Sequence, residues 1–468
     1  MNNFRFTKII AGVSPTLAKE TVLSKIINMV DAFRITLSKG YDDNNKKYID
    51  TLMKLDNSKT VILETKGIDI RIKNTWDLAV KKWDKWTAEY SEYAQEGNTK
   101  IYIDYPQLWE LKEGALLQCQ QSKVVLKIKS TKEDTAEVEV VDAGKWKIIQ
   151  YDRILFEGLN DFDEEELSER DKKDILWGLE YGAHVLGVSC ASSPEHIRSA
   201  KEFLENNNAK DMKVFAKIET ATGLKNLDSI LEVADGIIFA IDAFSDLKKD
   251  KIIEVIRRIK AVWKPVLITK VTTSYGKEFE ESFWEEIQEY SKEAIDGIML
   301  ETFLVEEEVF DAIEKTGNLL SDVENKLNEK TLARFEEAGD FEVRDYIIFN
   351  AFRSWNELWV KTAICFTDNG YTATRFSSLA PRIPVITFTQ SKETYRYLSL
   401  VWGVKGYKIS QSFNYENLKK IWKEMIRMIF KGNISLDDKI LILQANETID
   451  ADRGDMINGI ELYNFKNI

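Results

Sequence analysis

Eight short apolar runs alternate with helical patterns from the N-terminus to about residue 300, and this alternation restricts the possible folds more than any other feature. The runs begin near residues 6, 32, 60, 184, 213, 236, 265 and 297. A strand, a helix and a second parallel strand form a βαβ unit, and eight such units close into a (β/α)8 barrel. We therefore expect a TIM barrel whose functional side chains follow the carboxyl ends of its strands.

One of these units carries charged side chains at its strand ends. The strand Val214–Ile218 precedes a helical pattern and a second apolar run, Ile237–Ile241, which Asp242 closes. Lys217 and Glu219 are two residues apart, so they face the same side of an extended chain. A lysine and two carboxylates at neighbouring strand ends could hold a divalent metal together with an anionic substrate. An ordinary ion pair at a strand end accounts for the same residues, and both interpretations stay open here.

The overall composition excludes several classes of function. The chain has 468 residues, of which 44% are hydrophobic and 31% charged, as in globular multi-domain proteins. The net charge of −13 argues against nucleic-acid binding, and no apolar run is long enough for membrane insertion. With 3 cysteines and 2 histidines, a disulfide framework, a zinc site or a histidine triad is not expected. We expect a cytoplasmic protein.

Two stretches differ from the barrel pattern, and they predict additional domains. Residues 73–160 are expected to form a small β domain, in which Lys73–Glu96 is partly helical and later runs alternate with a period of two. Its clustered tryptophans, Trp76 and Trp83 among them, fit either a hydrophobic core or a partner surface. Residues 340–468 predict a C-terminal α/β domain that includes a helix over Tyr346–Thr362. The barrel is left with residues 1–72 and 161–335.

Several motifs resemble those of pyruvate kinases, and they occur in the same order. Lys217-Ile218-Glu219 resembles the Lys-Ile-Glu that ends one barrel strand in that family. Arg34–Gly40 (RITLSKG) resembles the family's second strand and the loop after it, and Glu64–Arg71 (ETKGIDIR) resembles the end of its third strand. The resemblance covers nearly the whole chain and is weakest over residues 73–160. It implies a TIM barrel with an inserted β lid domain and a C-terminal α/β domain.

The resemblance also implies roles for individual residues at the strand ends. Phosphoenolpyruvate and ADP would be the substrates, with Mg²⁺ and K⁺ as cofactors if the chain is active, although it is equally open that no metal binds. The residues implied are Arg34, Arg71 and Ser189 for substrate binding, Lys217, Thr269 and Lys270 for catalysis, Glu219 and Asp242 for the divalent metal, and Ser38, Glu64 and Thr65 for the monovalent cation.

Departures from the family pattern fall where the chemistry would take place. The metal-binding aspartate of the sixth strand aligns with Ala243, and Asp242 stands one residue earlier. On the seventh strand the catalytic threonine aligns with Lys270, while Thr269 is one place away. These losses favour a degenerate homologue, a pseudoenzyme that serves as a binding or structural subunit. The alternative is an active pyruvate kinase, which transfers the phosphoryl group of phosphoenolpyruvate to ADP in glycolysis.

Two further segments bear on ligands and partners. Thr367–Ala373 (TDNGYTA) resembles the family's effector loop, which implies sugar-phosphate contacts from Thr367, Asn369 and Thr372; a tight turn between a strand and a helix explains it equally well. The helix expected over Glu280–Lys292 has an apolar stripe that packs on the barrel or, with the tryptophans of residues 73–160, offers a protein-binding surface. We expect protein partners in a larger assembly or a homo-oligomer.

Overall fold

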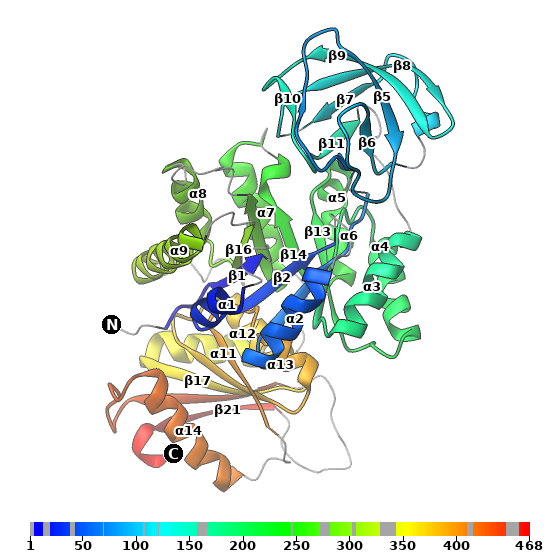
Figure 1. The fold of residues 1–468 in the computed structure, drawn as a ribbon. Coiled ribbons are helices and arrows are strands. Elements are labelled where there is room, and N and C mark those ends of the chain that lie inside the picture. The colour runs from blue at the N-terminus through cyan, green and yellow to red at the C-terminus, as the bar shows by residue number, and fades with distance from the viewer. Residues whose placement is uncertain are drawn as a thin grey trace.

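The chain folds into three parts that lie one above another in Figure 1. The computed structural model describes residues 4–12, 19–37, 43–68, 70–105, 108–119, 121–156, 166–244, 247–271, 281–301, 306–327, 343–409, 415–445 and 458–468. A parallel barrel occupies the middle, an inserted β domain covers one of its ends, and a C-terminal α/β domain lies at the opposite end (Figure 1). The boundaries predicted at 160/161 and 335/340 lie outside the described residues and stay predictions.

The barrel contains the eight strands that the sequence predicts. They close in the order β1-β16-β15-β14-β13-β12-β3-β2, and every neighbouring pair is parallel. The strands are β1 (Lys8–Gly12), β2 (Ala32–Thr36), β3 (Thr60–Glu64), β12 (Val185–Val188), β13 (Lys213–Ile218), β14 (Gly236–Ala240), β15 (Val266–Val271) and β16 (Gly297–Glu301). The predicted TIM barrel is confirmed.

Helices surround this barrel, as expected for βα repeats. They are α1 (Glu20–Ile26), α2 (Asp43–Leu55), α3 (Glu169–Tyr181), α4 (Pro194–Asn206), α5 (Ala221–Lys225), α6 (Leu227–Val233), α7 (Lys249–Ala261), α8 (Glu281–Ser291) and α9 (Glu306–Lys326). The apolar stripe of α8 is buried against the barrel: Phe283, Trp284, Ile287 and Tyr290 are all at most 6% exposed. This stripe is therefore part of the core and not a partner surface. None of the described helices combines the length and the apolar character needed to cross a membrane.

Alternate residues of each barrel strand face opposite sides, and this decides which side chains reach the interior. One residue from each strand packs into a single apolar cluster inside the barrel: Ile10, Ala32, Ile62, Val185, Phe215, Ile238, Leu267 and Met299. Their neighbours, such as Phe33 and Leu63, belong to the cluster between the strands and the surrounding helices. Four polar residues each follow a member of this interior cluster by two positions and therefore face the same side of the sheet. They are Arg34, Glu64, Lys217 and Thr269.

The inserted domain, here called the lid, is built from strands. Its six-stranded sheet has the order β11-β7-β8-β9-β5-β6, beside a two-stranded pair, β10-β4. The elements are β4 (Leu78–Ala79), β5 (Lys85–Tyr90), β6 (Ile101–Ile103), the 3-10 turn η1 (Leu108–Glu110), β7 (Leu116–Cys119), β8 (Val125–Lys132), β9 (Thr135–Asp142), β10 (Lys147–Ile148) and β11 (Ile154–Phe156). The helical pattern predicted within residues 73–96 is wrong, because β5 pairs along its length with β9. Trp76 and Trp83 are 65% and 63% exposed and do not enter the lid core.

The C-terminal domain is a five-stranded sheet in the order β19-β18-β17-β20-β21. Its elements are α11 (Val343–Leu358), β17 (Val360–Phe366), α12 (Tyr371–Ser378), β18 (Val385–Thr389), α13 (Lys392–Leu398), β19 (Val404–Lys408), α14 (Tyr415–Ile429), β20 (Lys439–Ala445), β21 (Asn458–Asn464) and a final 3-10 turn, η4 (Phe465–Asn467). The first helix ends at Leu358 and not at Thr362, because Trp359 adopts a left-handed backbone conformation (φ 59°) that stops the helix.

The C-terminal domain closes the base of the barrel, where the strands begin. The Lys8 ammonium group donates to the Val404 carbonyl (2.7 Å), and burial lowers the pKa of Lys8 to about 8. Asp296 joins both parts, since it accepts from the Trp402 backbone N–H (2.9 Å) and from the Lys260 ammonium group (2.7 Å). The apolar cluster inside the barrel is continuous with that of the C-terminal domain. The opposite end of the barrel, where the strands end, is left for the lid and the site.

His184 is a structural residue immediately before β12. Its Nδ1 accepts the Val61 backbone N–H (3.0 Å), and burial, followed by the charges of Arg396 and Lys392, lowers its pKa to about 3. The unfolded chain binds a proton here near pH 6.5, whereas the folded chain does not. This contribution to stability is complete above pH 6.5 and is lost progressively toward pH 3, by up to about 1.4 kcal/mol per pH unit.

We therefore expect the free energy of unfolding to fall more steeply between pH 6.5 and 5 in the wild-type chain than in His184→Gln. Denaturant unfolding at several pH values measures both slopes, and the difference between them removes the contribution of other titrating groups. Equal slopes would show that His184 titrates alike in the folded and unfolded chains.

Candidate active site

Four charged side chains meet inside the barrel mouth, at the carboxyl ends of β2, β3 and β13. The Arg34 guanidinium donates from Nε and Nη2 to the two oxygens of Glu64, each at 2.5 Å. The Lys217 ammonium group lies 3.1 Å from Glu64 Oε2 and 3.2 Å from Glu219 Oε2. Glu64 is fully buried, and Arg34 and Lys217 are 5% and 9% exposed. The pair Lys217 and Glu219 is thus part of a buried network and not a surface ion pair.

A glycine on the neighbouring strand makes room for the Glu64 side chain. Gly187 on β12 is directly opposite Glu64 in the sheet register. A Cβ atom at Gly187 would stand 2.9 Å from Glu64 Cγ and 3.0 Å from a methyl group of Ile238, closer than such atoms approach. The glutamate can therefore extend across the mouth and bind the Arg34 guanidinium in a bidentate manner.

The Glu219 carboxylate is engaged on both of its oxygens. Oε1 accepts the backbone N–H of Cys190 (3.0 Å) and faces its thiol (3.5 Å). Oε2 faces Lys217 and also the Arg153 guanidinium of the lid, whose Nη1 lies 3.8 Å away. Including Arg153, three cationic groups surround two carboxylates at this mouth. The cluster therefore has an excess of positive charge, which suits an anionic ligand.

The turn after β3 is tied to the end of β12. The Ser189 hydroxyl donates to the Thr65 carbonyl (2.6 Å), and the Ser189 backbone N–H donates to Thr65 Oγ1 (3.1 Å). Gly67 follows with φ 59°, and a Cβ atom there would lie 3.0 Å from the Ser189 carbonyl oxygen. Asp171 and Asp174, on α3, accept the next backbone N–H groups of this turn (2.8 Å each). Thr65 and Ser189 thus hold each other at the mouth.

Arg71 lies where the chain enters the lid. Its backbone N–H donates to Asp104 (2.6 Å), and its Nη1 donates to the Tyr151 carbonyl (3.1 Å). The backbones of Arg71 and Arg153 form an isolated antiparallel β-bridge between the two segments that connect the lid to the barrel. Residues directly opposite in an antiparallel pair share a face, so the two arginines belong to the same side of this connection. The sequence indicates Arg71 but not Arg153. The one sequence feature that could have indicated Arg153 is its basic character at the point where the chain returns from the lid to the barrel.

The ends of β14 and β15 differ from the predicted site. Asp242 is exposed, and it lies with Ala243 in the 3-10 turn η2 (Ile241–Phe244) that follows β14 directly. Thr269 is buried on β15, level with the interior residue Met299. The side chain of Lys270 is outside the described part of the chain, as is the whole of Ser38. Register therefore favours Thr269 over Lys270 for the interior position.

The donor groups present do not fit the two cations that the resemblance implies. Both oxygens of Glu64 are bound to cationic nitrogens, and Thr65 Oγ1 accepts a backbone N–H, so this pair offers little to a monovalent cation. Glu219 is likewise engaged by Lys217 and Arg153. Within the described residues, no three acidic, histidine or cysteine side chains converge as a metal site. A divalent cation at Glu219 would compete with these cationic groups for the carboxylate.

In the loop Thr367–Ala373, which resembles the family's effector loop, side chains accept hydrogen bonds from the loop's own backbone. Thr367 Oγ1 accepts the Gly370 backbone N–H (3.0 Å), and Asn369 Oδ1 accepts that of Tyr371 (3.0 Å). Thr372 is fully buried at the start of α12, and the Tyr371 hydroxyl donates to Asp345 (2.5 Å). Two backbone N–H groups of the loop, those of Gly370 and Tyr371, are thus engaged within it, and this geometry favours the tight-turn interpretation.

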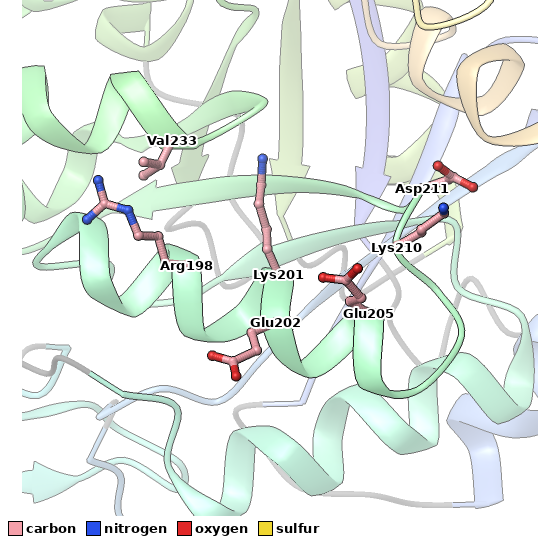
Figure 2. Close-up of a pocket in the computed structure, with 7 residues that line it drawn as sticks. All are labelled: Arg198, Lys201, Glu202, Glu205, Lys210, Asp211 and Val233. Atoms are coloured by element: carbon pink, nitrogen blue, oxygen red, sulfur yellow. The ribbon is translucent and has the colours of Figure 1, made fainter.

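A surface depression on the flank of the barrel is separate from this site. Its charged side chains come from α4 and the turn after it (Figure 2). Three basic and three acidic side chains line it with one apolar one: Arg198, Lys201, Lys210, Glu202, Glu205, Asp211 and Val233. These charges balance, so the depression offers no preference for an anion or a cation.

The fold and the mouth place this chain among (β/α)8-barrel proteins whose strand ends gather cationic groups. Family models of the pyruvate kinase barrel domain and of the pyruvate kinase alpha/beta domain match residues 4–271 and 345–458. The chain belongs to the pyruvate kinase family. It is 26% identical over 430 residues to pyruvate kinases of Staphylococcus aureus strains MRSA252 and USA300, covering 86% of this chain and 71% of each relative.

The structural comparison agrees with this assignment of the fold. A crystal structure of a pyruvate kinase from Cryptosporidium parvum superposes with a TM-score of 0.77 at 18% identity, covering 98% of this chain and 96% of that one. The predicted architecture, a barrel with an inserted β lid and a C-terminal α/β domain, is therefore confirmed.

Proposed function

We propose that the barrel mouth binds phosphoenolpyruvate and transfers its phosphoryl group to ADP, the pyruvate kinase reaction of glycolysis. The observation that carries this proposal is the convergence of Arg34, Lys217 and Glu219, from strands far apart in sequence, at one barrel mouth with an excess of positive charge. The relatives matched over most of the chain are named pyruvate kinases, which supports catalysis more directly than a role in binding alone.

The proposed chemistry depends mainly on charge neutralisation. In the transfer, the bond between the enol oxygen and phosphorus breaks, a bond from an ADP oxygen to phosphorus forms, and the enolate carbon then takes a proton. Lys217 faces the mouth beside Arg34, where its ammonium group can balance charge on the phosphoryl group. Arg34 holds Glu64 with two of its N–H groups, so the incoming phosphate competes with that carboxylate. The buried Thr269 is assigned to the side of the mouth where the enolate carbon takes its proton.

Pyruvate kinases generally use Mg²⁺ and K⁺, but no step proposed here passes through a metal, because the donors at Glu64 and Glu219 are engaged. We assign the reaction to the cytoplasm, since none of the three cysteines forms a disulfide.

A second candidate is a binding or structural subunit without turnover. It is favoured by the bidentate Glu64 carboxylate on Arg34, which occupies the guanidinium expected to bind phosphate. Four tryptophans of the lid are each more than half exposed, as at partner-binding surfaces: Trp76, Trp83, Trp109 and Trp146. In this candidate the lid contacts a protein partner in a larger assembly or another copy of the chain.

An assay of ADP-dependent pyruvate formation from phosphoenolpyruvate separates the two candidates. Turnover that requires both substrates supports the enzyme. Binding of phosphoenolpyruvate without turnover, together with migration of the native protein in a larger assembly, would instead support the binding subunit.

A further inference from the structure

The lid reaches into the barrel mouth through one side chain, Arg153. Its Nη1 lies 3.8 Å from Glu219 Oε2, and the two side chains are 19% and 7% exposed. Lys217 lies 3.2 Å from the same oxygen but stands on β13, two residues before Glu219, so it is fixed in the barrel wall. Arg153 is thus the cationic partner of Glu219 that another domain supplies.

The backbone around Arg153 is fixed to the lid and to the connection below it. The Asp152 carboxylate accepts the backbone N–H groups of Gln121 and Ser122 within the lid (2.8 Å each). On the other side, Ile154 N–H donates to the Ile70 carbonyl (2.8 Å), and Ile72 N–H donates to the Asp152 carbonyl (2.9 Å). These bonds leave Arg153 little freedom apart from its own side chain, and its position follows that of the lid.

We propose that Arg153 is a tethered counter-ion, which occupies Glu219 and competes directly with a divalent cation for Oε2. A guanidinium and a divalent cation repel each other at this separation, so the carboxylate cannot serve both fully. Cation binding then requires the Arg153 side chain to leave. Because such coupling is reciprocal, Arg153 weakens cation binding by the same factor by which a bound cation weakens the contact between Arg153 and Glu219. The inference rests on the proposed function only in treating Glu219 as the carboxylate that would hold a cation.

Mn²⁺ titration, followed by electron paramagnetic resonance of the free ion, tests this competition without either substrate. In Arg153→Gln, which removes the charge, we expect the affinity for Mn²⁺ to rise about five- to tenfold over the wild-type chain. In Arg153→Lys, which keeps the charge, affinity should stay near the wild-type value. Circular dichroism confirms that each variant is folded.

A second arginine at the boundary between lid and barrel supplies the control. Arg170 bonds to Glu92 of the lid and to Asp174 of α3 (2.8 Å each), and neither is Glu219. Arg170→Gln should therefore loosen the same boundary without changing Mn²⁺ affinity. An unchanged affinity in Arg153→Gln, or an equal rise in Arg170→Gln, would overturn the proposal. Since neither measurement uses phosphoenolpyruvate or ADP, a chain without kinase turnover would still give a clear result.

Discussion

Arg34→Met is expected to lower the free energy of unfolding by about 3 kcal/mol. The substitution removes the bidentate partner of Glu64, a carboxylate that is fully buried and would keep only the Lys217 ammonium group nearby. A buried charge that loses its partner cannot regain the solvation that it had in the unfolded chain. Urea unfolding followed by circular dichroism measures the loss, with the same protein concentration for each variant.

The double variant Arg34→Met with Glu64→Leu provides the matched comparison. It removes both charges and replaces them by apolar groups, so it should be destabilised less than Arg34→Met alone. A double variant that is destabilised by the sum of the two single substitutions would show that the pair does not interact energetically.

Lys217→Met is expected to reduce ADP-dependent pyruvate formation by about 10³-fold, because its ammonium group is placed to balance charge on the phosphoryl group in the mouth. Methionine keeps much of the length and apolar contact of the lysine stem. Arg34 still pairs with Glu64 and Arg153 still faces Glu219, so both carboxylates keep a cationic partner. Steady-state kinetics with the rate of pyruvate release as the signal provides the measurement.

Lys201→Met is a suitable control for that loss. Lys201 lies on the outer helix α4 and pairs with Asp235 at 3.0 Å, away from the mouth. It should keep wild-type turnover. Full turnover in Lys217→Met would contradict the assignment of this lysine and, with it, the proposed mechanism.

The barrel and part of its site could be predicted because both depend on local patterns. Each barrel strand is an apolar run after a helical pattern, and the spacing of Lys217 and Glu219 places both on one side of their strand. Register also bears on β15, where the sequence offered both Thr269 and Lys270 as catalytic residues. Thr269 pairs with the interior residue Met299 and is buried, so register favours it, and the choice between the two stays a prediction.

Other features depend on contacts between distant segments, which no local pattern reveals. Arg153 reaches Glu219 only because the lid folds back onto the mouth, and Gly187 accommodates Glu64 only through the register of β12 with β3. The helical pattern expected within Lys73–Glu96 is wrong for a related reason, since pairing of β5 with the distant β9 outweighs local preference.

The lid can be separated from the barrel more easily than the C-terminal domain can, and this difference determines which parts of the protein can be removed or exchanged. The lid has an apolar core of its own, and its two connecting segments are hydrogen-bonded neighbours at Ile70 and Ile154. A short splice between those residues would remove or exchange the lid and leave every barrel strand in place. The C-terminal domain also has an apolar cluster of its own, but a second set of its apolar side chains continues the cluster inside the barrel. Truncation before α11 would expose the apolar cluster at the base of the barrel, so we expect the barrel and the C-terminal domain to fold as one unit.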